Sequence, residues 1–148
     1  MTTIRVLVAD DDETMRRAIV DVLHAHGGFD VVADVGTGAG LPDLAARKRA
    51  QLVVLDVRMP SGGVAAARAL RERDPHTVVV AVSASNDVPT VAAMFRAGVT
   101  GFLAKGHLGT TFAEDLVRCT NGQVMIAVPH GIQVLRALRE PALEDAAD

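Results

Sequence analysis

Residues 52–60, LVVLDVRMP, place four consecutive apolar side chains directly before Asp56. A strand built from such a run is apolar on both faces, whereas a strand with one solvent-exposed face alternates polar and apolar residues. Strands that are buried on both sides belong to parallel sheets with helices packed on each face. The stretch therefore predicts an α/β fold in which a carboxylate stands at the end of a buried strand.

The same pattern, a short apolar strand followed by a helical segment, recurs along the chain. The other predicted strands are residues 4–9, 30–34, 78–82 and 101–104. In the segment after the first strand, one helical face carries Met15, Ala18, Ile19, Val22 and Leu23. Five β/α units result, which predicts a doubly wound, five-stranded parallel sheet.

Capping residues mark several of the predicted helix ends. Asp12 is placed to cap the first helix, Pro75 follows the third, and residues 111–114 have the form of a capping box. The fifth helix is expected to point three side chains inward, namely Phe112, Leu116 and Cys119.

The pattern changes after Gly122. Residues 123–128 form a short apolar run, and residues 129–139 have the mixed helical spacing of a sixth helix. We therefore expect one domain over residues 1–122, a linker with a C-terminal helix over residues 123–139, and a disordered tail over residues 140–148.

Composition excludes several classes of protein. Hydrophobic residues at 49% and charged residues at 22% are ordinary globular values, which excludes wholesale disorder. The single Cys119 cannot form an intramolecular disulfide, and the sequence before Asp10 lacks a targeting segment, so we expect a cytoplasmic protein. The apolar runs are too short to cross a membrane. A net charge of −3 without Trp or Tyr argues against direct nucleic-acid binding by this chain.

Polar residues follow the predicted strands where ligands bind in an open parallel sheet. They are Asp10, Asp11, Asp56, Ser83 and Lys105. Carboxylates about 5 Å apart repel by roughly 3 kcal/mol per pair at an effective dielectric constant of 20, so the three acids favour a bound divalent cation. Mg²⁺ suits oxygen ligands and leaves positions open for a phosphoryl oxygen. A metal, an ammonium and a hydroxyl around a carboxylate are the groups that phosphoryl transfer requires.

Four motifs carry a resemblance to the receiver domains of two-component response regulators. They are residues 8–11 (VADD), 55–60 (LDVRMP), 82–84 (VSA) and 101–105 (GFLAK), and the resemblance covers residues 4–122. It implies a flavodoxin-like fold and a signalling switch that turns over no metabolite. Because the region after Gly122 resembles the linker of regulators with a helix-turn-helix output domain, it also implies transcription regulation through a domain outside this chain.

The resemblance implies a role for each acidic residue. Asp56 would accept a phosphoryl group from a sensor histidine kinase. Asp11 would bind Mg²⁺ directly, Asp10 mainly through water, and the backbone carbonyl of Arg58 would join Asp56 as a further ligand.

The resemblance also implies a switch. Lys105 would pair with the phosphoryl group, Ser83 would move to hydrogen-bond it, and Phe102 would turn inward behind the hydroxyl. The face made by the fourth helix, fifth strand and fifth helix would then change its affinity for a partner or for a second copy of the chain. Two departures from the family pattern are Gly106, where a cis proline is common, and Phe102 in place of a tyrosine; the first favours a trans peptide bond.

Two other functions remain open from the residues. Asp10 to Thr14 also resembles the nucleophile motif of haloacid-dehalogenase-type phosphatases, with Asp10 as nucleophile, but that assignment leaves residues 56–60 unexplained. The second is an interaction module of receiver shape that works without phosphorylation.

Three further features are expected to be structural. Residues 36–40 (GTGAG) are expected to form a flexible loop, because their glycine spacing does not match a nucleotide-binding motif. Arg16 and Arg17 are expected on a solvated helix face that could meet a kinase. The five histidines lack metal-ligand spacing and are expected at the surface.

Overall fold

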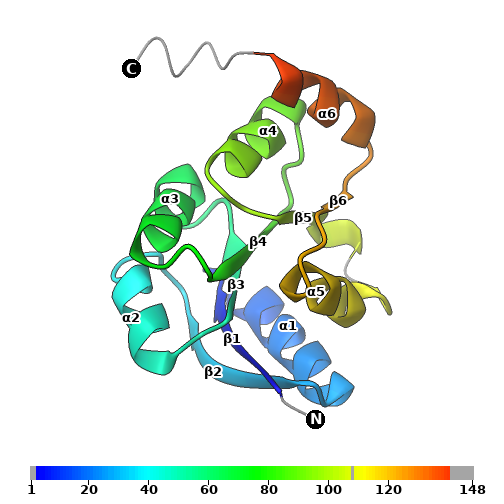
Figure 1. Cartoon of the computed structure of the whole chain (residues 1–148). Coiled ribbons are helices and arrows are strands. Elements are labelled where there is room, and N and C mark those ends of the chain that lie inside the picture. Colours follow the sequence, from blue (N-terminus) through cyan, green and yellow to red (C-terminus); the bar gives the residue numbers. More distant parts are fainter. Residues whose placement is uncertain (1–2, 108, 141–148) are drawn as a thin grey trace.

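The structure is a computed structural model that describes residues 3–107 and 109–140 (Figure 1). Its strands are β1 (Ile4–Ala9), β2 (Phe29–Val35), β3 (Leu52–Asp56), β4 (Val78–Ser83), β5 (Gly101–Ala104) and β6 (Met125–Ala127). Its α-helices are α1 (Glu13–His26), α2 (Leu41–Lys48), α3 (Gly63–Arg73), α4 (Val88–Arg96), α5 (Phe112–Thr120) and α6 (Gly131–Arg139), and a 3₁₀ turn covers Lys105–His107.

All strand pairs are parallel, in the order β2-β1-β3-β4-β5-β6. Because neighbouring side chains along a strand point to opposite faces, Val53 and Leu55 enter one apolar cluster while Leu52 and Val54 enter the other. Helices α2, α3 and α4 contribute to the first cluster, and α1 and α5 contribute to the second, so helices cover both faces (Figure 1). The predicted doubly wound sheet is confirmed.

The expected number of strands is wrong by one. Strand β6 pairs with the edge strand β5, and the backbone amide of Met125 donates to the carbonyl oxygen of Thr100 at 3.0 Å. The sequence-based prediction left residues 123–128 as an apolar run because three half-buried residues give no periodic signal. The sixth helix begins two residues later than expected, at Gly131, with His130 before it.

The predicted helix faces and caps need two corrections. Ala18 and Val22 are exposed, so the buried face of α1 is narrower than the sequence pattern suggested and contains Ile19 and Leu23. Thr111 makes no side-chain cap to α5, and the predicted capping box is absent there. The side chain of Asp12 caps α1 as expected, and the predicted inward residues of α5 are all buried. Most of the predicted tail, residues 141–148, lies outside the described residues.

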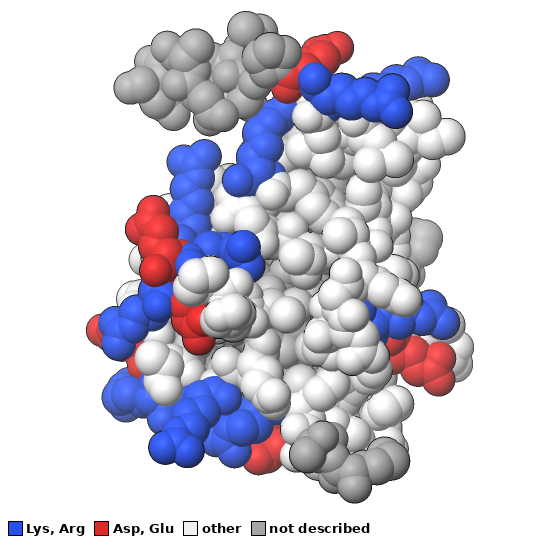
Figure 2. Space-filling view, viewed as in Figure 1, with Lys and Arg blue, Asp and Glu red and all other residues white. Residues whose placement is uncertain are grey.

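The C-terminal helix packs against α4. Val134 is fully buried among apolar side chains that include Met94, while Arg96 on α4 donates to the carbonyl oxygen of Ala137 at 2.7 Å. The opposite side of α6 exposes Ile132, and basic side chains lie over this end of the molecule (Figure 2). Part of the expected α4–β5–α5 face is therefore covered by α6 and β6 in this structure. None of the helices in residues 3–107 and 109–140 is long and apolar enough to cross a membrane.

Candidate functional site

Three carboxylates converge where β1 and β3 end. Asp10 and Asp11 follow β1, Asp56 closes β3, and one carboxylate oxygen from each lies within 4.8 Å of the other two. Asp10 is fully buried and Asp56 is 2% exposed, whereas Asp11 is exposed. The predicted grouping is confirmed, and its third carboxylate opens to solvent.

Lys105 completes the cluster from the turn after β5. Its Nζ lies 2.9 Å from Oδ2 of Asp10 and 3.4 Å from Oδ2 of Asp56. Burial by itself lowers the pKa of Lys105, but the hydrogen bonds and charges of the two aspartates outweigh it and raise the pKa above its ordinary value. Lys105 therefore carries a full positive charge at neutral pH.

The Asp56 side chain is held by a backbone hydrogen bond, but its surroundings disfavour the ionised form. Its Oδ1 accepts a hydrogen bond from the backbone amide of Arg58 at 3.2 Å. Burial raises the pKa of Asp56 to about 6, and the neighbouring Asp10 adds to this, while the Arg58 amide and Lys105 act in the opposite direction. At pH 7 most of the Asp56 side chain is therefore ionised and able to act as a nucleophile.

The donor set fits a hard divalent cation. Oδ1 of Asp10 accepts a hydrogen bond from the Asp12 amide at 3.0 Å, and its buried Oδ2 lies 2.9 Å from the Lys105 ammonium. Three carboxylates and one ammonium leave two uncompensated negative charges. Mg²⁺ matches this residual charge and prefers oxygen ligands of this kind.

Ser83 and Phe102 lie buried on the neighbouring strands β4 and β5. The Oγ of Ser83, at the end of β4, accepts a hydrogen bond from the Ser85 amide at 3.0 Å. Phe102 is fully buried and belongs to the same apolar cluster as Val134 of α6. The ring is therefore in its inward position in this structure, and its movement on phosphorylation stays a prediction.

Arg16 is the site residue that the sequence reasoning missed. Its side chain is only 20% exposed, and Nη1 donates to the carbonyl oxygen of Asp10 at 2.7 Å while Nε pairs with Asp34 at 3.0 Å. The prediction of a solvated arginine is wrong for Arg16, although Arg17 is 78% exposed as expected. The acid at the end of the neighbouring strand was the available signal, since an arginine on the first turn of α1 can reach it.

The glycine segment 36–40 is held in place. The amide of Gly38 and the hydroxyl of Thr37 both donate to the carbonyl oxygen of Pro60, at 2.8 Å and 3.1 Å. A Cβ at Gly38 would collide with the carbonyl oxygen of Ser61. The segment is therefore held against the loop that follows Asp56 by two hydrogen bonds.

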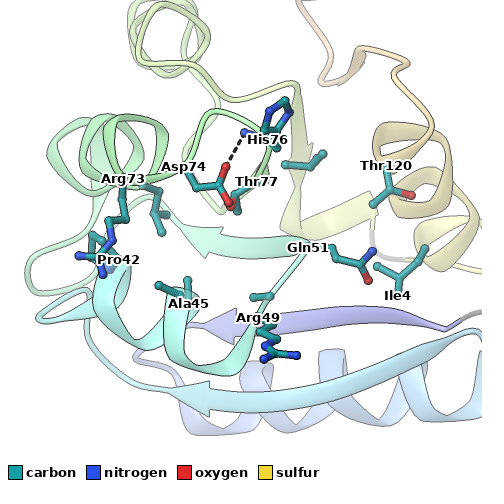
Figure 3. A pocket seen from close by; sticks show the side chains of 14 residues that line it. Ile4, Pro42, Ala45, Arg49, Gln51, Arg73, Asp74, His76, Thr77 and Thr120 are labelled. Atoms are coloured by element: carbon teal, nitrogen blue, oxygen red, sulfur yellow. Dashed lines mark hydrogen bonds between the residues drawn. The ribbon is translucent and has the colours of Figure 1, made fainter.

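A cavity of about 570 Å³ lies at the opposite end of the sheet (Figure 3). Of the charged groups that line it, Arg73 pairs with Asp43 at 2.6 Å, and Asp74 accepts a hydrogen bond from the His76 amide at 2.9 Å. Among the described residues, three carboxylates come together at the carboxyl end of the sheet and not at this cavity. The four histidines with described side chains, His24, His26, His76 and His130, are exposed as expected.

The peptide bond between Lys105 and Gly106 is trans, as expected, since the described residues contain no cis peptide bond. Gly106 itself is exposed, and a Cβ there would meet no other atom within 4 Å. The missing proline therefore leaves Lys105 in contact with both buried aspartates.

Comparisons with known proteins agree with this geometry. The probable transcriptional regulatory protein NarL of Mycobacterium tuberculosis (strain CDC 1551 / Oshkosh) is 30% identical over 125 residues, covering 84% of this chain and 58% of NarL. The response regulator GacA of Pseudomonas viridiflava is 35% identical over 104 residues, covering 70% of this chain and 49% of GacA. The chain thus spans about half the length of these curated relatives.

A solved structure matches as well. The signal receiver domain of NarL from Mycobacterium tuberculosis superimposes with a TM-score of 0.79 at 29% identity, covering 83% of this chain and all of that domain. The sequence model of the response regulator receiver domain family matches residues 6–114 of this chain. This range includes all three clustered aspartates, Ser83 and Lys105. With most of its length matched in this way, the chain belongs to the response regulator receiver domain family.

Proposed function

We propose that Asp56 is the phosphoacceptor of this receiver domain and that a sensor histidine kinase supplies the phosphoryl group. The observation that carries the proposal is the position of the Asp56 carboxylate at the end of β3, with Lys105 at 3.4 Å and two further acids beside it. A carboxylate oxygen of Asp56 would attack phosphorus as the phosphorus–nitrogen bond to the kinase histidine breaks. The histidine ring nitrogen keeps the bonding electron pair.

The same cluster would hold Mg²⁺. Asp11 and Asp56 would bind it directly, Asp10 mainly through water, and the carbonyl oxygen of Arg58 would be a further ligand. A bound divalent cation offsets the negative charge of the carboxylates and of the incoming phosphoryl oxygens. Lys105 would stabilise the transferred group through its ammonium, which it can do once that group draws it away from the aspartates.

Ser83 would report the phosphorylated state to the rest of the domain. Its oxygen accepts a hydrogen bond from the Ser85 amide in this structure, and its hydroxyl proton would be donated to a phosphoryl oxygen. Because Ser83 and Ser85 are linked by this contact, a movement of Ser83 toward the phosphoryl group would draw the loop after β4 with it. Phe102 lies on the neighbouring strand in the cluster that also contains Val134. A shift of this ring would therefore reach the α4–α6 contact without any change in its exposure.

The partners follow from this arrangement and from the relatives. A change at α4 and α6 would alter the affinity for a partner or for a second copy of the chain. Relatives such as NarL carry names of transcriptional regulators and are longer than this chain, which supports an output domain outside residues 1–148 and action in the cytoplasm. We assign no direct nucleic-acid contact to this chain.

Mass spectrometry after treatment with acetyl phosphate and Mg²⁺ tests the proposal. Phosphate on the peptide with Asp56 is the expected result. Phosphate on Asp10 would support the phosphatase-like alternative, which the burial of Asp10 already disfavours. A protein that stays unmodified with both acetyl phosphate and a phosphorylated histidine kinase would support the interaction module instead.

A further inference from the structure

Arg16 connects two elements to the backbone of the acidic cluster. Its guanidinium donates to the carbonyl oxygen of Asp10 at 2.7 Å and pairs with Asp34 of β2 at 3.0 Å. The Asp10 carbonyl belongs to the peptide unit that joins the buried carboxylate to the exposed carboxylate of Asp11. The orientation of this peptide therefore decides whether both side chains face Asp56.

The neighbouring loop leaves room for this contact. A Cβ at Gly36 would lie 3.1 Å from Nη1 of Arg16 and 3.8 Å from Cα of Asp11. A side chain at position 36 would therefore crowd the guanidinium in the place where it meets the Asp10 carbonyl. This gives the first glycine of the segment 36–40 a role that its spacing alone did not explain.

We propose that Arg16 is a positioning residue that fixes the Asp10–Asp11 peptide and thereby sets the affinity of the acidic cluster for Mg²⁺. The inference rests on the proposed function, because it assumes that the cluster binds this cation. Residues that hold a metal's ligands in place typically change affinity by about 10–100-fold when they are removed.

The charge of Arg16 and its positioning role predict opposite changes in Mg²⁺ affinity when the residue is removed. Arg16 is a cation beside a cation site, so its removal without any change in geometry would strengthen Mg²⁺ binding by reducing repulsion. Loss of positioning would instead weaken it. The sign of the change therefore separates the two roles.

The test measures Mg²⁺ affinity by calorimetry, together with the amide NMR shifts of Asp11 and Asp12. We expect Arg16→Met to weaken binding by about tenfold and Arg16→Lys, which keeps one donor and the charge, to recover part of the loss. Arg17→Met is the matched control, because Arg17 is exposed and pairs with Glu13 at 3.7 Å. It should leave the affinity unchanged or slightly higher.

A second variant covers the case in which Arg16→Met does not fold. Gly36→Ala keeps Arg16 and its charge but crowds its guanidinium, and we expect a weaker, several-fold loss of affinity with the same amide shifts. If the wild-type protein binds Mg²⁺ and every folded variant binds it equally well or more tightly, the inference is overturned and the proposed function stands. Failure of the wild-type protein to bind Mg²⁺ would instead overturn the proposed function.

Discussion

At the carboxyl edge of the sheet, buried charged groups face one another, whereas apolar side chains and one arginine join α4 to α6. Asp10 and Asp56 share Lys105 at the first site, and burial raises the pKa of Asp56 to about 6. At the second, Val134 is fully buried and Arg96 binds a helix-end carbonyl. The first region thus depends on pH and ions, while the second depends on packing.

The comparison teaches where each property of the domain comes from. Clustered acids make the domain less stable, and under the proposed function they are the groups that would take up a cation and a phosphoryl group. The α4–α6 contact contributes stability and lies against the cluster that contains Phe102. The same apolar cluster contains Ala9 and Leu55, which directly precede Asp10 and Asp56, so packed side chains connect the two regions.

The largest effect is expected from a charge placed in the α4–α6 contact. Val134→Asp should destabilise the domain by about 3–5 kcal/mol or detach α6, because it buries an unpaired carboxylate. Gln133→Asp is the matched control, since Gln133 is exposed on the same helix. Urea unfolding measures both, and equal stability of the two variants would mean that α6 does not pack on α4.

A neutral side chain at position 56 should stabilise the domain, whereas the charge introduced by Val134→Asp destabilises it. The folded pKa of Asp56, about 6, lies above its ordinary value of 3.8, so the folded protein holds a proton that the unfolded chain releases. The free energy of unfolding therefore falls as pH rises from about 4 to 6. Without divalent cations at pH 7, Asp56→Asn should stabilise the domain by about 1–3 kcal/mol.

Urea unfolding at pH 4.5 and pH 7, with a chelator present, measures this difference. Most of the extra stability of Asp56→Asn should vanish at pH 4.5, because Asp56 is then mostly protonated in the folded wild-type protein. Asp21→Asn provides the control, because Asp21 is an exposed carboxylate on α1. A wild-type protein that is more stable than Asp56→Asn at pH 7 would contradict the electrostatic account of the cluster.

The same pKa predicts how Mg²⁺ binding responds to acid. Because protons and the cation compete for Asp56, affinity should be nearly constant above pH 7 and fall by up to about tenfold per unit below pH 6. Calorimetric titrations at pH 5, 6, 7 and 8 measure this dependence. A flat profile across this range would show that Asp56 is not a ligand.

The smallest expected effect concerns the coupling between the acidic cluster and the α4–α6 contact. Ser83→Ala should still accept phosphate at Asp56, but the NMR shifts that phosphorylation causes in α4 and α6 should shrink, since no hydroxyl draws the loop after β4 inward. Ser85→Ala is the matched control, because its backbone amide, not its hydroxyl, binds Ser83. Identical shifts in wild type and Ser83→Ala would refute the coupling.

The acidic edge could be predicted because parallel strands bring their ends together. A carboxylate after each of two apolar runs must then lie near the other, whatever the helices do. The contact of Arg16 with the carbonyl oxygen of Asp10 could not be predicted, because sequence spacing does not encode a hydrogen bond to the backbone, whereas its pairing with Asp34 had a sequence signal. Strand β6 escaped prediction since three residues gain their order from pairing with β5, and the buried position of Phe102 depends on packing from α4 and α6.

Phosphorus NMR of the protein with acetyl phosphate tests the central claim most directly. The account predicts a protein-bound acyl-phosphate resonance that requires Mg²⁺, disappears when a chelator is added before the donor, and is absent from Asp56→Asn under every condition. The same resonance in Asp56→Asn, at wild-type intensity, would contradict the assignment of Asp56 as the phosphoacceptor.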